Sequence, residues 1–343
     1  MSLRKPLVSI LTPVYNGEEF LVECIESVLA QTYQNWDYTI VNNCSTDRTL
    51  EIAQRYASQD SRIRIHNNQK FVRAVPNHNI AFARISPDSK YAKMVFADDW
   101  LYPECIERMV DLAEEHPSVG IVGAYGLRGT EVMWTGLPYS SQVVSGRYIC
   151  RRLFFERLHV FGTATSHMIR SDLVRARRPF YNESNLHADM EVCVELLKTS
   201  DFGFVHQVLT FTRERADSLT TVTRNLNTLA PGLLHDLVTH GSFYLTPAER
   251  SACLEENLSR YYSFLARSVM ERRDEAFWNF HKKKLQEAGV GFDRLRLTRA
   301  FLSKVLNVVL NPKQTFDELV QGNTVLRRAK LSKRSGRETA CAQ

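Results

Sequence analysis

In the N-terminal part of the chain, short apolar runs alternate with stretches whose apolar residues recur at helical spacing. The apolar runs are rich in β-branched residues and predict buried strands. They cover residues 7–13, 36–42 and 63–66. Between them, residues 18–31 and 49–57 have apolar side chains at helical spacing, which predicts two helices. The order strand, helix, strand, helix, strand is typical of a parallel sheet with helices on its faces.

The same alternation continues to residue 125 and then gives way to a mixed pattern and finally a helical one. Further strands are predicted at residues 91–97, 119–125, 163–169 and 203–211. Further helices are predicted at residues 77–85, 104–115, 189–199, 249–272, 274–288 and 294–310. We therefore expect an α/β fold with a mostly parallel central sheet flanked by helices, followed by a helical C-terminal region.

Composition, charge and cysteine content limit the class of protein but do not indicate an activity. The chain has 343 residues, 44% hydrophobic and 24% charged, which is ordinary for a soluble globular protein. Its formal charge of +6 is too mild to indicate nucleic-acid binding, and it fits anionic ligands or an anionic membrane surface. Seven scattered cysteines without a CxxC pair favour a reducing compartment. Because no signal peptide or membrane-spanning run is recognised, we expect a cytoplasmic protein.

Two adjacent carboxylates, Asp98 and Asp99, follow the predicted strand at residues 91–97. Ligand sites in open parallel sheets lie outside the carboxyl ends of the strands. Neighbouring carboxylates repel each other unless a cation neutralises them, so the pair is a candidate site for a divalent metal that would hold a diphosphate. A solvated turn or a helix N-cap is the alternative interpretation, and the pair alone does not decide between them.

Three other polar groups are candidates for binding or catalysis. The segment from Asn42 to Asp47 follows the second strand and could bind a base or ribose, or simply cap a helix. Asp189 begins a predicted helix and is either its cap or a general base, with Glu191 as the competitor for that role. Basic side chains after strands, arginines above all, suit a diphosphate, and the chain has Lys70, Arg73, Arg213 and Arg215 at such positions.

Taken in order, these segments resemble the inverting glycosyltransferases of family 2, which have an A-type nucleotide-sugar-binding fold. The resemblance covers roughly residues 6–222. It rests on VSILTPVYNGEEFLVECIESVLAQTY from Val8, then WDYTIVNNCSTDRT, FADDWLYPE, HADMEVCVELL and FTRERADSLT. It implies a catalytic domain at residues 1–225, with a nucleotide-sugar half at about 1–125 and an acceptor half at about 126–225. A helical region at 226–326 and a disordered basic tail at 327–343 would follow.

The resemblance also implies roles for individual residues. Asp189 would be the catalytic base. Asp99 would bind Mg²⁺ or Mn²⁺ directly, with Asp98 directed to the ribose or the metal. The side chains expected to contact the nucleotide sugar are Thr12, Pro13, Tyr15, Glu19, Asn43, Arg73, Asp98, Arg213 and Arg215. The expected donor is a nucleoside-diphosphate sugar, most simply a UDP-sugar, and the expected acceptor is a glycan or a lipid-linked acceptor.

The sequence departs from the family pattern in three ways. Asn42-Asn43 stands where the family often has Asp-Asp or Asp-Asn, Phe96 replaces the first acid of the metal motif, and Arg215 replaces a late histidine. Arginine cannot coordinate a metal but can neutralise phosphate as a fixed cation. A catalytically silent nucleotide-sugar-binding or scaffold protein therefore stays an alternative. A nucleotidyltransferase fits less well, because residues 12–18 are not a glycine-rich basic phosphate loop.

The predicted helix at residues 294–310 has an apolar stripe and several basic residues, and basic residues continue into the tail. One interpretation is a helix packed on the catalytic domain, as for most amphipathic helices. The other is reversible attachment to the inner face of a membrane, where basic residues are attracted to anionic lipids. The oligomeric state is not indicated.

Overall fold

The computed structural model describes residues 5–214 and 226–310 of the chain, so Arg215 and the predicted tail at 327–343 lie outside the described residues. The chain divides into two compact units, residues 1–254 and 255–343. The strands are β1 Val8–Val14, β2 Trp36–Asn42, β3 Ile63–Asn67, β4 Tyr91–Met94, β5 Trp100–Leu101, β6 Val119–Arg128, β7 Glu131–Met133, β8 Val143–Val144, β9 His167–Arg170 and β10 Asp201–Thr212. The helices of the first unit are α1 Leu21–Leu29, α2 Thr49–Gln59, α3 Ala74–Phe82, α4 Cys105–Glu115, α5 Gly146–Glu156, the 3₁₀ turn η1 Ala164–Ser166, α6 Ser171–Arg175, α7 Ala188–Leu196 and α9 Leu229–Tyr244.

One sheet forms the centre of the first unit, and its strand order is β3-β2-β1-β4-β9-β6-β10-β5. The strands β1, β2, β3 and β4 are parallel, and β6 is parallel to β10. Between these two groups, β9 pairs antiparallel with both β4 and β6. Because β9 reverses the direction twice, β4 and β6 run the same way, and all the long strands end at the same edge of the sheet. The expected mostly parallel α/β fold is confirmed.

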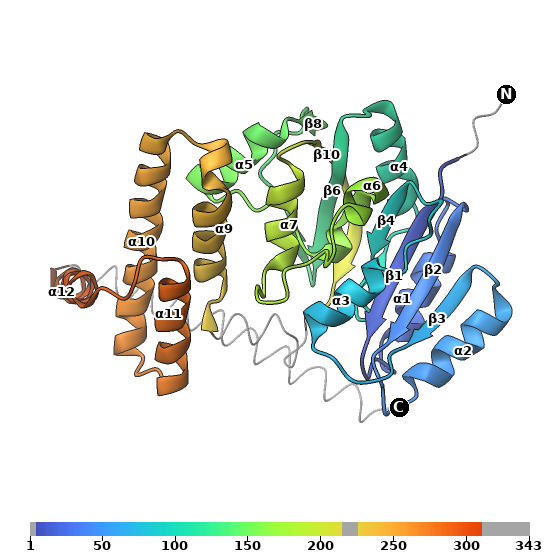
Figure 1. Cartoon of the computed structure of the whole chain (residues 1–343), viewed down its shortest axis with the longest axis horizontal. Coiled ribbons are helices and arrows are strands. Elements are labelled where there is room, and N and C mark those ends of the chain that lie inside the picture. Colours follow the sequence, from blue (N-terminus) through green and yellow to red (C-terminus); the bar gives the residue numbers. More distant parts are fainter. Residues whose placement is uncertain (1–4, 215–225, 311–343) are drawn as a thin grey trace. The chain divides into compact units, whose positions relative to one another are not determined.

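The sheet is buried on both faces, which explains why its central strands are continuous apolar runs. In β1, Val8, Ile10 and Val14 pack into one apolar cluster with α1, α2 and α4. Leu11, which points to the opposite face, packs into a second cluster with α3, α5 and α7. The alternation within a single strand therefore divides the core into two layers, and the helices in Figure 1 cover both faces of the sheet.

Two predicted elements differ from the structure near the end of β4. The predicted strand at 163–169 begins only at His167, because Thr163 and Ser166 cap each other around the turn η1. The predicted strand at 91–97 ends at Met94, because residues 96–99 turn back through a hydrogen bond from the Asp99 N–H to the Phe96 carbonyl. Both differences have a tertiary cause, because the Phe96 N–H of the 96–99 turn donates a hydrogen bond to the Thr165 hydroxyl of η1.

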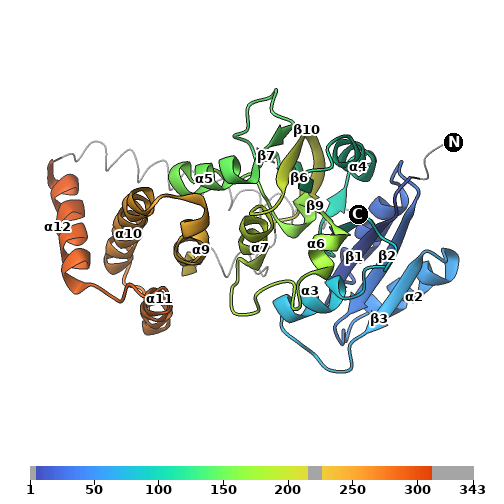
Figure 2. The ribbon, with the colours of Figure 1, turned by 45° about the horizontal axis from the view of Figure 1, so that its top comes forward.

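The first unit extends beyond the predicted boundary at residue 225 and includes α9 and the start of α10. Leu233 and Leu237 of α9 belong to the same apolar cluster as α5 and α7. The Tyr244 hydroxyl donates to the Val194 carbonyl of α7, and Arg151 of α5 donates to the Tyr244 carbonyl at 3.0 Å. Figure 1 and Figure 2 both show α9 beside α7. The first part of the helical region is therefore part of the unit that contains the sheet.

The second unit is helical, as the sequence predicts. It contains most of α10 Pro247–Met270, with α11 Glu275–Glu287 and α12 Arg294–Leu310. Its interior includes the fully buried His281, whose Nδ1 lies 2.6 Å from the Tyr261 hydroxyl. The hydroxyl of Tyr262 accepts a hydrogen bond from the Asp293 N–H at 2.6 Å, just before α12 begins. Within the described part of the chain, no helix is long and apolar enough to cross a membrane.

The start of α5 leaves no room for a side chain at Gly146. A Cβ added there would lie 2.1 Å from the Leu197 carbonyl oxygen and 2.3 Å from that of Ser200. We expect Gly146→Ala to lower the free energy of unfolding by about 1–3 kcal/mol, because backbone atoms must move to relieve the overlap. Gly241→Ala is the control, because its Cβ would meet only side-chain atoms. Urea unfolding of both variants measures the difference, and equal midpoints would contradict the packing described here.

Candidate functional site

The candidate site lies at the sheet edge where the parallel strands end. β1 ends before Tyr15, β2 before Asn43 and β10 before Arg213, and the turn that follows β4 carries Asp98 and Asp99. Residues that are far apart in the sequence are brought to one edge by the shared strand direction. Most of the candidate residues follow these strands in the sequence, so the topology brings them to one edge.

Asp99 is the buried centre of this edge and is only 3% exposed. Its Oδ2 accepts a hydrogen bond from the Thr165 hydroxyl at 2.7 Å, and its Oδ1 accepts one from the Arg213 N–H at 3.1 Å. Burial and the neighbouring charge of Asp98 together raise the pKa of Asp99 to about 7. A cation bound beside Asp98 and Asp99 would offset the repulsion between the two carboxylates. It would thereby favour the ionised form of Asp99.

Arg213 connects the end of β10 to the aspartate pair. Its Nε donates to the Asp98 carbonyl oxygen at 3.2 Å, and its guanidinium forms an ion pair with Glu23 of α1. The guanidinium carbon also lies 4.4 Å from the centre of the Phe20 ring and 5.1 Å from that of Trp100. The side chain is therefore held by charge and by aromatic rings at a fixed place beside Asp98 and Asp99.

A buried lysine lies under the same turn and was not among the predicted site residues. Lys93 of β4 has no exposed surface, and its ammonium donates to the carbonyl oxygens of Thr165 and His167. Burial lowers the pKa of Lys93, whereas the charge of Asp99 opposes that shift. The only sign of Lys93 in the sequence is a single lysine within an apolar run. That sign is weak, because a lysine in such a strand can also extend its ammonium group to the surface.

Side chains at the end of β1 divide into buried and exposed groups. Thr12 is fully buried, and its hydroxyl donates to the Val95 carbonyl at 2.8 Å and accepts from the Tyr38 hydroxyl at 2.8 Å. Pro13 is also buried. Tyr15 and Glu19 are exposed, and the Tyr15 ring meets Phe71 edge to face with centroids 4.8 Å apart. Of these predicted base-pocket residues, Tyr15 and Glu19 are the ones that present side chains to solvent.

The amide of Asn43 organises the loop after β3. Its Nδ2 donates to the Val72 carbonyl at 2.8 Å, and its Oδ1 accepts from the Val72 N–H and from Asn68. Asn68 in turn donates to Asn77 at 2.9 Å. Because an amide can both donate and accept, asparagine at position 43 closes this network where an ionised aspartate could only accept. Arg73, exposed at the start of α3, follows the same loop.

Asp189 lies in the first turn of α7 and is half-buried. Its Oδ1 accepts from the Met190 N–H at 2.9 Å, which is the local contact expected of a capping carboxylate. Burial raises the pKa of Asp189, and the nearby His187 counteracts this. Since α7 runs back along the sheet before β10 begins, its first turn lies toward the edge where β10 ends (Figure 1).

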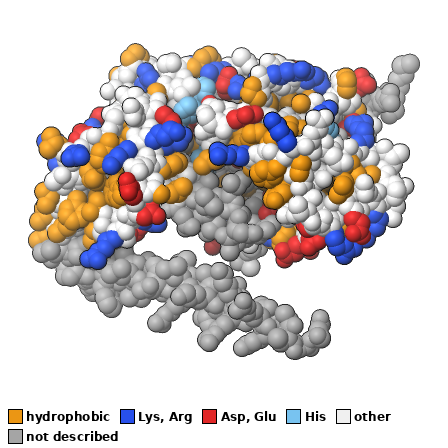
Figure 3. Space-filling view, turned by 60° about the horizontal axis from the view of Figure 1, so that its bottom comes forward, with side chains coloured by type: hydrophobic (Ala, Val, Ile, Leu, Met, Phe, Trp, Pro, Cys, Tyr) orange, Lys and Arg blue, Asp and Glu red, His pale blue; other side chains and the backbone are white. Residues whose placement is uncertain are grey.

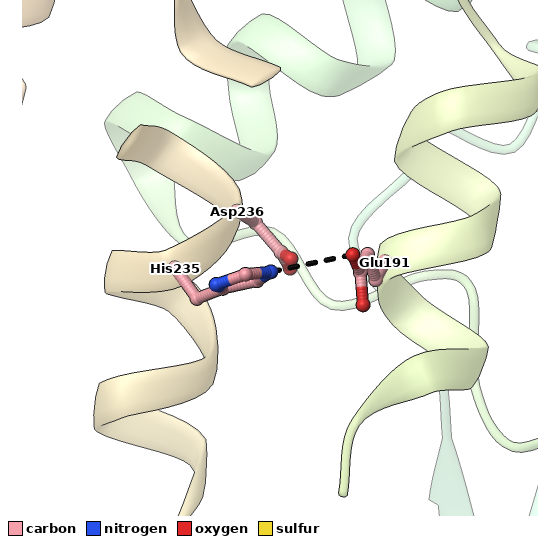
Figure 4. A group of neighbouring side chains, drawn as sticks. All are labelled: Glu191, His235 and Asp236. Carbon is pink, nitrogen blue, oxygen red and sulfur yellow. Dashed lines mark hydrogen bonds and ion pairs between the residues drawn. The ribbon is translucent and has the colours of Figure 1, made fainter. Parts of the chain in front are cut away.

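A second polar cluster connects α7 with α9. Glu191, His235 and Asp236 each offer a ligand atom, and these atoms all lie within 4.8 Å of one another. Figure 4 shows the three side chains pointing toward one another from the two helices. The sequence indicates Glu191 only as a competitor of Asp189 for the role of general base. His235 and Asp236 could not be recognised from the sequence, because residues 44 and 45 positions after Glu191 form no recognisable spacing motif with it.

Comparisons with known proteins agree with this geometry. The sequence profile described as Glycosyl transferase family 2 matches residues 9–182, about half of the chain. Among curated proteins, EpsE of Bacillus subtilis strain 168, whose name marks its glycosyltransferase activity as provisional, is 30% identical over 166 residues. That match covers 46% of this chain and 59% of EpsE, so the chain spans about three fifths of this relative.

Two solved structures have a similar fold. TarS residues 1–349 of S. aureus, in complex with UDP-GlcNAc, superimposes with a TM-score of 0.62 at 15% identity and covers 88% of each chain. The mannosyltransferase PcManGT of Pyrobaculum calidifontis, in complex with GDP-Man and Mn²⁺, has a TM-score of 0.51 at 11% identity, with 90% of this chain and 88% of that chain covered. At such low identity the likeness concerns the fold. The profile match over residues 9–182 shows that the chain belongs to glycosyl transferase family 2.

Proposed function

We propose that this protein transfers a sugar from a nucleoside-diphosphate sugar to a hydroxyl group of a glycan or lipid-linked acceptor, with inversion at the anomeric carbon. The observation that carries the proposal is the pair of the half-buried Asp98 and the buried Asp99, fixed to Arg213 at the edge where the strands end. A UDP-sugar is the proposed donor, supported by the fold shared with TarS, whose structure contains UDP-GlcNAc.

Asp98 and Asp99 fit a divalent cation of the Mg²⁺ or Mn²⁺ kind. Both oxygens of Asp99 accept one hydrogen bond, and each keeps a second lone pair for a ligand bond. Oxygen ligands are the ones these cations prefer, and PcManGT has the same fold with Mn²⁺ present. When bound, the cation would neutralise charge on the diphosphate. Arg213 would hold the turn in place through its contact with the Asp98 carbonyl.

Asp189 is proposed as the general base. The acceptor oxygen forms a bond to the anomeric carbon while the bond from that carbon to the diphosphate oxygen breaks. The acceptor proton passes to a carboxylate oxygen of Asp189, and the nucleoside diphosphate leaves with the bonding electron pair. Burial raises the pKa of Asp189, which makes its ionised form a stronger base. The carboxylate is held near the helix start by the Met190 N–H.

Tyr15 and Phe71 are proposed to contact the nucleobase. They are 49% and 56% exposed, and they form an edge-to-face pair beside the end of β1. Exposed aromatic rings offer a stacking surface for a base. The loop of Phe71 is fixed by Asn43 through the Val72 backbone, so the position of the ring depends on that amide. Glu19 and Arg73 are proposed as polar contacts at this edge, as is Arg215, which lies outside the described residues.

The metal proposal is tested by Asp99→Asn, with Asp88→Asn on an exposed loop as the matched control. We expect Asp99→Asn to lower sugar transfer by about 10²-fold or more, because the variant loses the carboxylate that would hold the cation against the diphosphate. Mn²⁺-dependent strengthening of UDP binding should also disappear. Both are measured by transfer assays and calorimetric titration with UDP, with and without chelator. Full activity of the wild type in chelator would contradict the metal proposal.

The base proposal is tested by Asp189→Asn, which is nearly isosteric and retains capping ability. We expect the transfer rate to fall by about 10²-fold while UDP binding is unchanged, because the proton acceptor is lost and the donor site is intact. Glu191→Gln is compared in the same assay. If Glu191→Gln loses the rate and Asp189→Asn keeps it, the roles must be exchanged. If neither changes the rate, a catalytically silent nucleotide-sugar-binding protein is the better interpretation.

We also propose that α12 attaches the protein to an anionic membrane surface on the cytoplasmic side, where a lipid-linked acceptor would be available. Leu295, Leu302, Leu306 and Leu310 of α12 are each more than half exposed. Basic residues lie on the same helix, among them Arg296 and Arg299. Figure 3 shows apolar side chains gathered near blue basic ones at the left of the view, where Figure 1 places α12. An exposed apolar face with flanking basic charge is typical of interfacial helices.

Co-sedimentation with liposomes of rising anionic lipid content tests this attachment. We expect salt-sensitive binding that weakens in Leu302→Ser/Leu306→Ser, because the double variant removes apolar side chains from the exposed face of α12. Binding should also weaken after removal of residues 327–343, because each basic residue contributes about 1 kcal/mol near an anionic surface. Val132→Ser is the control, since Val132 is an exposed apolar residue on β7, far from α12 in the sequence. If the wild type stays in the supernatant at low salt, α12 is an ordinary helix of the second unit.

A further inference from the structure

The cluster of Glu191, His235 and Asp236 has the composition of a metal site outside the aspartate pair. His235 Nε2 lies 3.3 Å from Glu191 Oε1, and His240 Nε2, one turn further along α9, lies 4.0 Å from the same oxygen. The ligand atoms of the first three residues lie within 4.8 Å of one another and converge on one point between the helices (Figure 4). Such convergence of an imidazole and two carboxylates from two helices is a common arrangement for a divalent cation.

Asp236 supplies the independent observation that points to a ligand. Its side chain is fully buried, yet neither carboxylate oxygen has a hydrogen-bond partner among the described residues. Buried polar groups are almost always paired, because an unpaired one keeps the full cost of losing its water. Burial, followed by the charges of Glu191 and Asp189, raises the pKa of Asp236 well above its usual range. A bound cation would supply the missing partner for both oxygens.

Glu191 is already held in the orientation that a ligand needs. Asn185 donates to its Oε2 at 2.8 Å, and Asn182 donates to its Oε1 at 3.2 Å. Burial acts against ionisation, but hydrogen bonds from His235 and these two amides hold the pKa of Glu191 at about 2. Amide donors that fix a ligating carboxylate are the usual outer contacts of metal sites.

We propose that Glu191, His235 and Asp236 bind a divalent transition-metal cation of the Zn²⁺ class and that this cation fastens α7 to α9. An imidazole ligand favours Zn²⁺ over Mg²⁺, which prefers oxygen ligands throughout. The site is thereby distinct in chemistry from Asp98 and Asp99, which lie after β4 and offer oxygen atoms only. His235 is about one-third exposed, which gives the cation a path from solvent.

The cation would act on the sugar-transfer site by position, because Glu191 follows Asp189 by two residues in the first turns of α7. Fastening α7 to α9 fixes the segment that carries Asp189. The cation binding itself does not depend on the proposed transferase activity, and it can be measured without any donor or acceptor.

Equilibrium dialysis against micromolar Zn²⁺, followed by elemental analysis of the full-length protein, tests the site. We expect wild type to bind one equivalent more than His235→Gln or Asp236→Asn, and the affinity for that equivalent to fall by about 10²-fold or more in either variant. Any zinc held by Asp98 and Asp99 is present in all three proteins and cancels. His116→Gln, at the end of α4, is the control histidine and should bind as wild type does.

Thermal unfolding provides the second measurement. Zn²⁺ should raise the melting temperature of wild type and of His116→Gln but not of Asp236→Asn, because a ligand that binds the native state stabilises it. Metal-free Asp236→Asn should be about as stable as metal-free wild type, since a neutral amide of nearly the same shape replaces a buried acid whose raised pKa favours its neutral form. If Asp236→Asn does not fold, the comparison rests on His235→Gln, whose side chain is partly exposed. Equal zinc content in wild type and both ligand variants would overturn the proposal and leave Asp236 as a neutral buried acid.

Discussion

The buried carboxylate of Asp99 is the contact on which the arrangement of the candidate site depends. It lies in the turn after β4, and its two oxygens accept hydrogen bonds from Thr165 of η1 and from the backbone of Arg213 after β10. Segments that follow Asp99 by 66 and 114 residues are thereby fixed around one group. Because burying a carboxylate is costly, this arrangement is stable only while both donors, or a cation, remain in place. Lys93 beneath the turn adds a nearby positive charge.

The sheet was predictable from the sequence because its signals are local. Runs such as those of β1 and β2 are apolar throughout, and the helices between them show their spacing within a few turns. The reversal at β9 was not predictable, because nothing within His167–Arg170 states which neighbours the strand will have. The early end of β4 is similar, since the turn at Phe96 is fixed by Thr165, a residue from a distant segment.

The candidate site was predictable where its residues follow the end of a strand or lie at the beginning of a helix. Asp98, Asp99 and Arg213 meet as expected, because shared strand direction places them together. The ion pair of Arg213 with Glu23 could not be inferred, since it joins residues 190 positions apart. The same is true of the cluster formed by Glu191, His235 and Asp236, whose members become neighbours only when α9 packs on α7. Local sequence patterns predict which residues belong to one helix or strand. They do not predict which helices and strands pack together to form a site.

Trp100 gives the protein an optical reporter next to this site. Its indole stacks on Phe211 with ring centres 3.7 Å apart and planes 5° apart, and its ring centre lies 5.1 Å from the guanidinium carbon of Arg213. Indole emission responds to nearby charge, and here that charge is set by the balance between Arg213 and Glu23. An anion that drew the guanidinium away from Glu23 would alter the surroundings of the indole directly. The intrinsic fluorescence of Trp100 therefore offers a label-free signal of site occupancy that requires no knowledge of the sugar.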